Sequence, residues 1–232
     1  MNFEKLDGVS VEALLFDLDG TLLDSAPDLT TAIDRMLVEL RYQAAGIERV
    51  RKWVGDGARQ LVIEALRFAQ APVDNASIDD AFVSEALQIY QRHYGACLSQ
   101  SSELFPGVRE ALQHWRELGL RMACVTNKGA RFTEPLIEHF GLRELLPVVI
   151  SGDTLAQRKP DPAPLLEACR RLEVQPQRAL MIGDSRNDVR AARAANMPVI
   201  CVRHGYNHGR SIENENPDVI VDSLLYLVSC FG

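Results

Sequence analysis

VEALLFDLDGTLLDS, residues 11–25, is the stretch around which the chain is organised. Its first six residues, Val11–Phe16, are mostly apolar, and so short an apolar run predicts a buried β-strand. Asp17 and Asp19 follow directly, and Gly20 lets the backbone turn away from the strand. Two carboxylates at the end of a buried strand repel each other and lose hydration unless a cation or a shared proton compensates. The stretch therefore predicts a magnesium site with a carboxylate free to attack an electrophile, although Asp before Gly is also typical of a turn or a calcium-like loop.

Short apolar segments alternate with amphipathic ones along the second half of the chain. Predicted helices separate the predicted strands, which span residues 120–125, 147–150, 179–182, 198–202 and 218–221. This alternation is typical of an α/β fold with a doubly wound, Rossmann-like parallel sheet. Ligands bind such sheets outside the carboxyl ends of the strands. Polar residues that follow different strands are therefore expected to meet at one edge.

The segment between the first two predicted strands is different, because it is helical throughout. Its apolar residues follow helical spacing with no strand pattern. It leaves the sheet at the edge where the polar residues gather, and so it is expected to lie above them. We expect an all-helical cap domain inserted into an α/β catalytic core, with the cap at residues 24–98 and the core at residues 1–23 and 99–232.

The segment after the predicted cap, residues 99–107, is polar and contains Pro and Gly. Such composition is typical of a linker. Cap and core are expected to move relative to each other, with hinges near Asp24-Ser25 and Ser99–Ser102.

Composition and charge exclude several classes of function. Of the 232 residues 47% are apolar and 25% charged, as in soluble globular proteins. A net charge of −7 without a basic stripe argues against a nucleic-acid or membrane partner. Five scattered cysteines in no CxxC spacing argue against a disulfide framework or a structural zinc site. No apolar run reaches a membrane span and no signal peptide is evident, so we expect a cytoplasmic protein. We expect it to be a monomer or a homodimer.

Three further polar segments could share a site with the first acidic pair. Thr126 and Asn127 follow a predicted strand and offer a hydroxyl and backbone N–H groups to phosphate oxygens. Lys159 precedes a rigid Pro-Asp-Pro turn and could neutralise an anion. Asp184 and Asp188 lie at i, i+4 across a strand-to-helix turn, where the first could reach a metal ion and the second a metal-bound water or the lysine. Taken singly, each has a plainer interpretation: a loop start, a solvated lysine and a helix cap.

Together and in this order, these segments resemble the four motifs of the haloacid dehalogenase superfamily of phosphatases. The motifs stand here as DLDGT at residues 17–21, Thr126-Asn127, Lys159, and GDSRND at residues 183–188. The resemblance covers essentially the whole chain. It implies a small phosphorylated anion as substrate and Mg²⁺ as cofactor. A dehalogenase would be expected to lack the second carboxylate, Asp19.

The resemblance also implies roles for particular residues. Asp17 would be the nucleophile that forms an aspartyl-phosphate. Asp19 would be the general acid that protonates the leaving oxygen and then activates water, or else a metal ligand only. The implied Mg²⁺ ligands are Asp17, Asp19 and Asp184. Asp188 would hold a metal-bound water or Lys159 and would not bind the ion itself. The residues implied to bind the phosphoryl group are Thr126, Asn127 and Lys159, of which Thr126 and Lys159 are also assigned to catalysis.

Three stretches resemble the phosphoglycolate phosphatases within that superfamily, namely residues 17–29, 53–61 and 203–225. The implied reaction is hydrolysis of 2-phosphoglycolate to glycolate and phosphate. In the second stretch, Arg59 could reach a substrate carboxylate or be a solvated helix residue. In the third, the residues that could line the mouth of the cleft, or be purely structural, are His204, Tyr206, Asn207 and His208.

Two other classes of function remain open. A phosphatase for another small phosphate, such as a sugar phosphate, would use the same catalytic residues, and a phosphomutase shares the aspartyl-phosphate chemistry. A binding module on a degenerate phosphatase fold would lack the nucleophile or the acid. Neither is missing here, so the sequence favours an enzyme.

Overall fold

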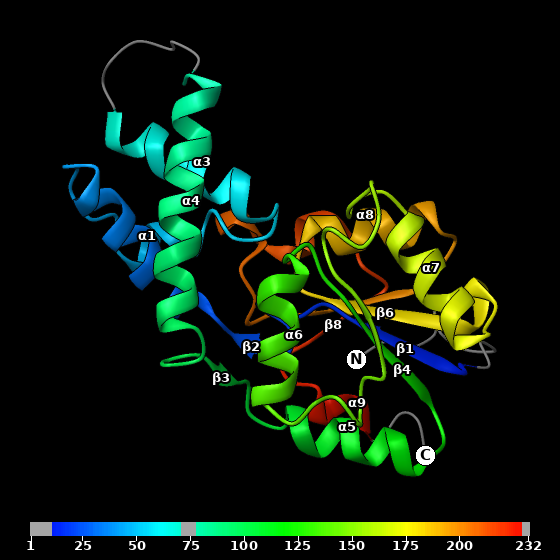
Figure 1. Ribbon diagram of the computed structural model, residues 1–232. Coiled ribbons are helices and arrows are strands. Elements are labelled where there is room, and N and C mark those ends of the chain that lie inside the picture. The colour runs from blue at the N-terminus through cyan, green and yellow to red at the C-terminus, as the bar shows by residue number, and fades with distance from the viewer. Residues whose placement is uncertain (1–10, 71–77, 229–232) are drawn as a thin grey trace.

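The computed structural model describes residues 11–70 and 78–228 (Figure 1). Residues 71–77 and one of the five cysteines, Cys230, lie outside the described residues. A six-stranded parallel sheet forms the centre, with the strand order β5-β4-β1-β6-β7-β8. Its strands are β1 (Ala13–Phe16), β4 (Arg121–Val125), β5 (Val148–Ile150), β6 (Ala179–Gly183), β7 (Val199–Val202) and β8 (Val219–Val221). The predicted doubly wound α/β fold is confirmed.

The register of β1 with its two neighbours aligns the ends of three strands. Phe16 pairs with Cys124 of β4 and with Ile182 of β6. The backbone N–H of Asp17 then donates to the carbonyl of Ile182, which extends the ladder by one step. The three chains therefore leave the sheet at the same level, and the polar residues that follow them emerge at one edge.

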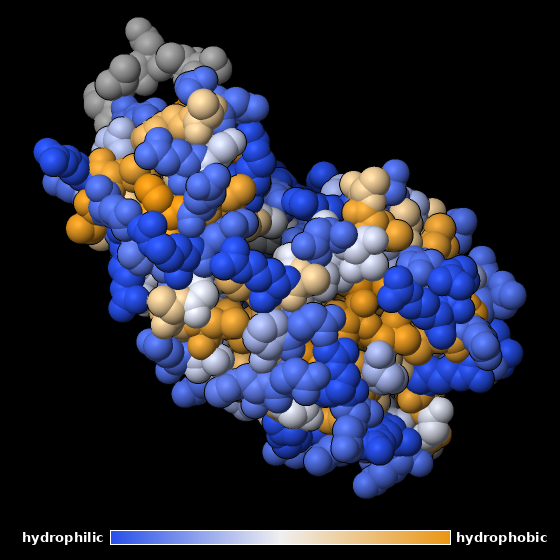
Figure 2. Space-filling model, viewed as in Figure 1, coloured by the Kyte–Doolittle hydropathy of each residue, from blue (hydrophilic) through white to orange (hydrophobic). Residues whose placement is uncertain are grey.

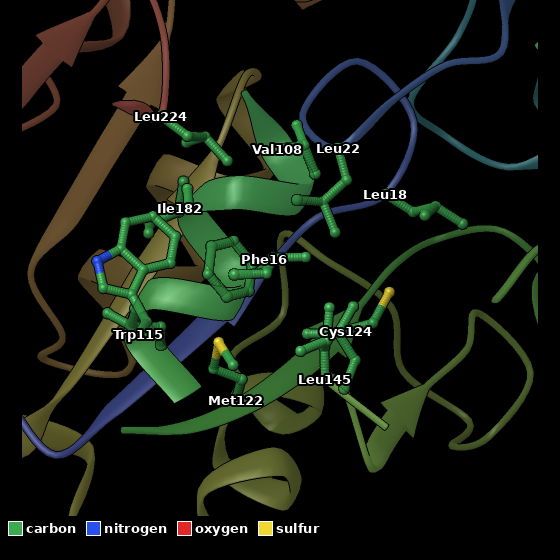
Figure 3. Close-up of a cluster of buried hydrophobic side chains, with 14 of the residues drawn as sticks. Phe16, Leu18, Leu22, Val108, Trp115, Met122, Cys124, Leu145, Ile182 and Leu224 are labelled. Carbon is green, nitrogen blue, oxygen red and sulfur yellow. The ribbon is translucent and has the colours of Figure 1, made fainter. Parts of the chain in front are cut away.

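Helices cover both faces of the sheet. This is required because successive side chains of β1 point to opposite faces and all of them are apolar. Leu14 and Phe16 belong to the hydrophobic cluster on one face, and Ala13 and Leu15 to that on the other. In the first cluster Phe16 stacks against Trp115, with ring centroids 5.6 Å apart (Figure 3). The helices on that face are α5 (Val108–Glu117), α6 (Ala130–His139) and α9 (Leu225–Val228), and those on the other are α7 (Ala163–Leu172) and α8 (Arg186–Ala194).

Four further helices form a separate helical unit, which lies to one side of the sheet (Figure 1). They are α1 (Ala26–Glu39), α2 (Ile47–Val50), α3 (Ala58–Gln70) and α4 (Asp80–Cys97). The unit has a hydrophobic core of its own, which Phe132 and Tyr206 join from the sheet-bearing part. The surface narrows between the two parts (Figure 2). Within the described ranges, no helix has the length and apolar character needed to cross a bilayer.

The segment after α4 is more ordered than the sequence predicts. Strand β3 (Glu103–Leu104) pairs antiparallel with β2 (Leu23–Asp24), so the two chains that join the helical unit to the sheet run side by side. The segment that the sequence predicts as a linker, residues 99–107, therefore contains a short strand. A pairing of two residues on each side is too short to leave an alternating pattern in the sequence.

A buried carboxylate holds this double connection together. Asp28, which is 1% exposed, lies in the first turn of α1. Its side chain accepts hydrogen bonds from the backbone N–H groups of Ser101 and Ser102, at 2.8 and 3.0 Å, and from the hydroxyl of Ser102 at 2.5 Å. Hydrogen bonds to a charged acceptor are the stronger kind, so Asp28 ties the start of the helical unit to its end.

Replacing Asp28 is expected to loosen the connection. Asp28→Ala leaves three donors without an acceptor and should lower the free energy of unfolding by about 2–4 kcal/mol, measured by urea denaturation followed by circular dichroism. Asp28→Asn keeps one acceptor oxygen and should cost less. Asp79→Ala, at an exposed helix cap that accepts one hydrogen bond from the N–H of Phe82, is the control. An Asp28→Ala variant no less stable than this control would contradict the assignment.

Candidate active site

A lysine and two aspartates meet at the edge of the sheet where β1 ends. Lys159 Nζ lies 3.1 Å from Asp17 Oδ1 and 2.7 Å from Asp188 Oδ1, and its side chain is only 1% exposed. Burial by itself lowers the pKa of Lys159, but the charges of Asp17 and Asp188 outweigh burial and raise this pKa above its usual range. The ammonium is therefore charged and compensates two buried carboxylates.

Asp184 follows β6 and lies beside Asp17. Its Oδ1 accepts a hydrogen bond from the hydroxyl of Thr21 at 2.9 Å, and its Oδ2 accepts one from the backbone N–H of Tyr206 at 2.8 Å. Its carboxylate is packed so tightly that a Cβ atom on Gly20 would lie 2.4 Å from Asp184 Oδ2. Gly20 also has a φ of +87°, so this close approach and this turn both require glycine.

Asp188 combines a capping role with a charge role. Its Oδ2 accepts hydrogen bonds from the backbone N–H groups of Asp184 and Ser185, at 3.1 and 3.0 Å, and from the Ser185 hydroxyl at 2.8 Å. Its Oδ1 accepts from Lys159. The alternative interpretation as a helix cap, by Asp184 or Ser185, is thus right for Ser185, which caps α8 together with Asp188. The carboxylate of Asp184 instead accepts hydrogen bonds from Thr21 and Tyr206.

The acidic group formed by Asp17, Asp184 and Asp188 has oxygen atoms within 4.8 Å of one another. Burial raises the pKa of Asp17 to about 7 against the opposing charge of Lys159. Burial, together with the charges of Asp188 and Asp17, raises the pKa of Asp184 well above its usual range. Carboxylate oxygens are the donors that hard divalent cations prefer, and a bound cation would relieve the repulsion. The donor set therefore fits a divalent metal ion.

The side chain of Asp19 is not part of this acidic group. Its Oδ1 accepts a hydrogen bond of 2.5 Å from the Ser25 hydroxyl, and its Oδ2 lies 3.2 Å from Lys128 Nζ. Lys128 also donates a hydrogen bond of 2.7 Å to the hydroxyl of Tyr94, on helix α4 of the helical unit. The sequence interpretation did not single out Lys128. The signal was present, because Lys128 directly follows Thr126-Asn127 at a strand end.

A small cavity, about 50 Å³ in volume, lies above these carboxylates, between the sheet edge and the helical unit. Asp17, Asp19 and Thr126 line it from the sheet side. The residues that line it from the helical unit are Leu29, Val54, Gly55, Gly57, Ala58, Leu61, Tyr90 and Tyr94. The cavity thus brings together the carboxylates after β1 and the threonine after β4, as the strand ends predict.

The loop Gly55-Asp56-Gly57 fastens the helical unit to the sheet edge. The side-chain amide of Asn127 donates to the carbonyl of Gly55 at 2.9 Å and to the carbonyl of Lys159 at 2.9 Å. Asn187 donates to Asp56 Oδ1 at 2.7 Å, and Arg186 forms an ion pair of 3.2 Å with Asp56. The amide of Asn127, implied as a phosphate contact, is therefore occupied in joining the two parts.

The structure does not bring Arg59 to the cavity. Its guanidinium forms an ion pair of 2.6 Å with Asp80 at the outer surface of the helical unit, where the two side chains are 46% and 91% exposed. Arg59 is not on the cavity wall, although its neighbour Ala58 is. The solvated interpretation of Arg59 matches this placement.

The loop over residues 203–208 makes contacts outside the cavity. Tyr206 donates to Asp24 Oδ1 at 2.6 Å and accepts from the backbone N–H of Ala26 at 3.1 Å, at the start of the helical unit. Asn207 accepts from the backbone N–H of Arg186. His204 packs on Phe105, and His208 Nε2 lies 3.9 Å from Asp56 Oδ1. The contacts of Tyr206 and His208 connect the two parts of the molecule, whereas those of Asn207 and His204 lie within the sheet-bearing part.

Comparison with known proteins agrees with this geometry. Residues 11–196 match the family of haloacid dehalogenase-like hydrolases. A phosphoglycolate phosphatase of Pseudomonas putida is 45% identical over 230 residues, which cover 97% of this chain and 82% of the relative. Another, of Nitrosococcus oceani, is 44% identical over 216 residues, which cover 92% of this chain and 93% of the relative. A crystal structure described as a predicted phosphoglycolate phosphatase from Haemophilus somnus has a TM-score of 0.91 at 30% identity, covering 97% of this chain and 100% of that one.

The chain therefore belongs to the haloacid dehalogenase-like hydrolases. Within that family it is a phosphoric monoester hydrolase similar to phosphoglycolate phosphatases. The resemblance found in the four sequence motifs is confirmed.

The raised pKa of Asp17 predicts how a divalent ion and pH act together on stability. Without an ion, folding raises this pKa from 3.8 to about 7, so between these values the folded chain holds a proton that the unfolded chain has released. The contribution of Asp17 to stability is fully present below about pH 4 and is lost as pH rises through 7. Millimolar Mg²⁺ should raise the melting temperature by about 4–8 °C near pH 8, and by less near pH 5, because the ion must displace the proton.

Scanning calorimetry at the two pH values measures this difference. Asp184→Asn should reduce the shift near pH 8, whereas Asp80→Asn, at an exposed carboxylate, should leave it unchanged. A shift as large near pH 5 as near pH 8 would speak against the ion binding at these buried carboxylates.

Proposed function

We propose that the protein hydrolyses 2-phosphoglycolate with Mg²⁺ through an aspartyl-phosphate on Asp17. The observation that carries this proposal is the position of Asp17 itself. It is a buried carboxylate on the cavity wall, 3.1 Å from the ammonium of Lys159 and within the acidic group that fits a divalent ion. A nucleophilic carboxylate divides phosphoryl transfer into two easier steps.

In the first step, a carboxylate oxygen of Asp17 attacks phosphorus in line with the leaving oxygen, and the phosphoryl group becomes covalently attached to Asp17. Lys159 reduces the repulsion between this carboxylate and the phosphoryl oxygens. Thr126 lines the cavity and offers its hydroxyl to the same oxygens. The Mg²⁺ ion would supply charge neutralisation of the developing transition state.

Asp19 handles the proton in both steps. It lines the cavity two residues from the nucleophile, and Ser25 and Lys128 hold its two oxygens. Asp19 gives a proton to the departing glycolate oxygen and then accepts one from the water that hydrolyses the aspartyl-phosphate. The side chain of Asp19 is not part of the acidic group described above, because it is held by Ser25 and Lys128. We therefore assign the metal to the carboxylates of Asp17 and Asp184.

The helical unit would act as the cap over this chemistry. We assign residues 24–98 to a cap domain and residues 1–23 and 99–232 to a core domain, with hinges at Asp24-Ser25 and Ser99–Ser102. The paired strands β2 and β3 and the carboxylate of Asp28 lie at these hinges. Contacts of the cap loop with Asn127 and Asn187 support a closed arrangement that excludes water from the cavity.

The size of the cavity and the names of the relatives support a small substrate. A volume of about 50 Å³ leaves room for little beyond a phosphoryl group with a short organic tail. The relatives from Pseudomonas putida and Nitrosococcus oceani are phosphoglycolate phosphatases at 44–45% identity. Release of inorganic phosphate from a panel of phosphorylated small acids and sugars, with Mg²⁺ present, tests the choice, and a clear preference for a sugar phosphate would overturn it.

Replacing the nucleophile is expected to abolish turnover. Asp17→Asn should lower kcat by about 10⁴-fold or more, because the amide cannot form the covalent intermediate. With ³²P-labelled substrate and an acid quench, the wild-type enzyme should carry a hydroxylamine-sensitive phosphoryl group and the variant none. Asp80→Asn should retain both turnover and labelling. Labelling of the Asp17→Asn variant would show that another residue is the nucleophile.

A further inference from the structure

The cavity above Asp17 has a single basic side chain on its wall. Among the lining residues that the structure describes, Lys128 alone carries a positive charge, while Asp17 and Asp19 are negative. The side chain of Lys128 is 6% exposed, so its charge acts inside the molecule. Lys159 is not part of the wall, and its ammonium is already shared between Asp17 and Asp188.

The hydrogen bonds of Lys128 leave it able to take a further partner. An ammonium group has three N–H donors. The structure assigns one to the hydroxyl of Tyr94 at 2.7 Å and places Asp19 Oδ2 3.2 Å away. Burial raises the pKa of Tyr94 well above its usual range, so its hydroxyl keeps its own proton while it accepts from Lys128. Lys128 and Tyr94 thus present two donors at the cavity.

Apolar and aromatic side chains form much of the remaining wall of the cavity. Leu29, Leu61 and Phe132 line the cavity, and Tyr94 packs edge-on against Phe132 with ring centroids 4.8 Å apart. In such surroundings a charge interacts more strongly than it does in water. A ligand that places an anionic group here gains a charge-assisted hydrogen bond, whereas a neutral tail gains only apolar contact.

The cavity also places two binding groups within reach of one small ligand. Asp17, Asp19 and Lys128 all line it, and Lys128 is in contact with Asp19 Oδ2. A short acid that carries its carboxylate one methylene from the phosphate ester oxygen would direct its phosphoryl group to Asp17 and its carboxylate to Lys128. The carboxylate would then take the place of Asp19 as the partner of Lys128, which frees Asp19 for the leaving oxygen.

We propose that Lys128, oriented by Tyr94, binds the carboxylate of the substrate and determines selectivity for phosphorylated small acids over neutral phosphate esters. This inference rests on the proposed hydrolysis of 2-phosphoglycolate. It assigns recognition of the carboxylate to Lys128 at the sheet edge and Tyr94 on helix α4, a role for which the sequence offers Arg59 as one of two interpretations.

The test compares 2-phosphoglycolate with ethyl phosphate, which has a methyl group in place of the carboxylate. The quantity measured is the ratio of kcat/KM for the two substrates. Lys128→Met should lower this ratio by about 10-fold to 100-fold, because one charge-assisted hydrogen bond is lost. Lys128→Arg should restore part of it. Tyr94→Phe should lower it by about 2-fold to 10-fold, and Arg59→Met, the exposed control, should not change it.

Two outcomes separate this inference from the proposed function. If the wild-type enzyme prefers 2-phosphoglycolate and Lys128→Met lowers kcat/KM equally for both substrates, Lys128 only positions Asp19 and the inference is overturned while the function stands. If the wild-type enzyme uses both substrates equally, the proposed substrate and the role of Lys128 are overturned together.

Binding measured without turnover keeps the test valid if the lysine variant is inactive. In the Asp17→Asn background, calorimetry should show that Lys128→Met weakens binding of 2-phosphoglycolate by about 10-fold or more and leaves binding of ethyl phosphate within about 2-fold. Circular dichroism confirms that each variant is folded. Equal weakening for both ligands would contradict the inference.

Discussion

The burial of three carboxylates around one lysine is the constraint on which the rest of the molecule depends. Asp17, Asp184 and Asp188 leave water when the sheet edge forms, and Lys159 compensates only part of their charge. Ionised carboxylates without a partner are costly inside a protein. Either a proton held by these carboxylates or a further cation would complete the compensation, and a divalent cation fits the donor set.

This acidic centre explains why the neighbouring backbone is so closely packed. Gly20 and Gly205 each lie against Asp184, where a Cβ atom would come within 2.4 and 2.0 Å of its side chain. The parallel register of β1, β4 and β6 delivers the polar residues to the same level. A rigid sheet thus positions groups that come from distant parts of the chain, which is the usual way in which a doubly wound fold builds a site.

The helical unit contributes to the site through contacts with the same edge. The carbonyl of Gly55 accepts from Asn127, and the hydroxyl of Tyr94 accepts from Lys128. Each contact joins the helical unit to a residue of the loop after β4. In the proposed cap movement, closure of the helical unit would be coupled to the position of Lys128 and, through Lys128, to Asp19. The chemistry of the core and the choice of substrate would then depend on one short loop.

The local sequence contained most of what defines the fold and the acidic residues. The apolar run before Asp17, the alternation of strands and helices, and polar residues directly after strands are all short-range patterns, and each follows from burial and backbone periodicity. The pairing of β2 with β3 was missed because it is only two residues long. The surroundings of Lys128 and Arg59 could not be predicted from the sequence, because each is a basic residue close to a stretch that resembles the family. The two residues differ in which side chains surround them in the folded protein. One is buried against Tyr94 and Asp19, and the other is exposed beside Asp80. Such a difference arises from packing between distant segments, and no local pattern records it.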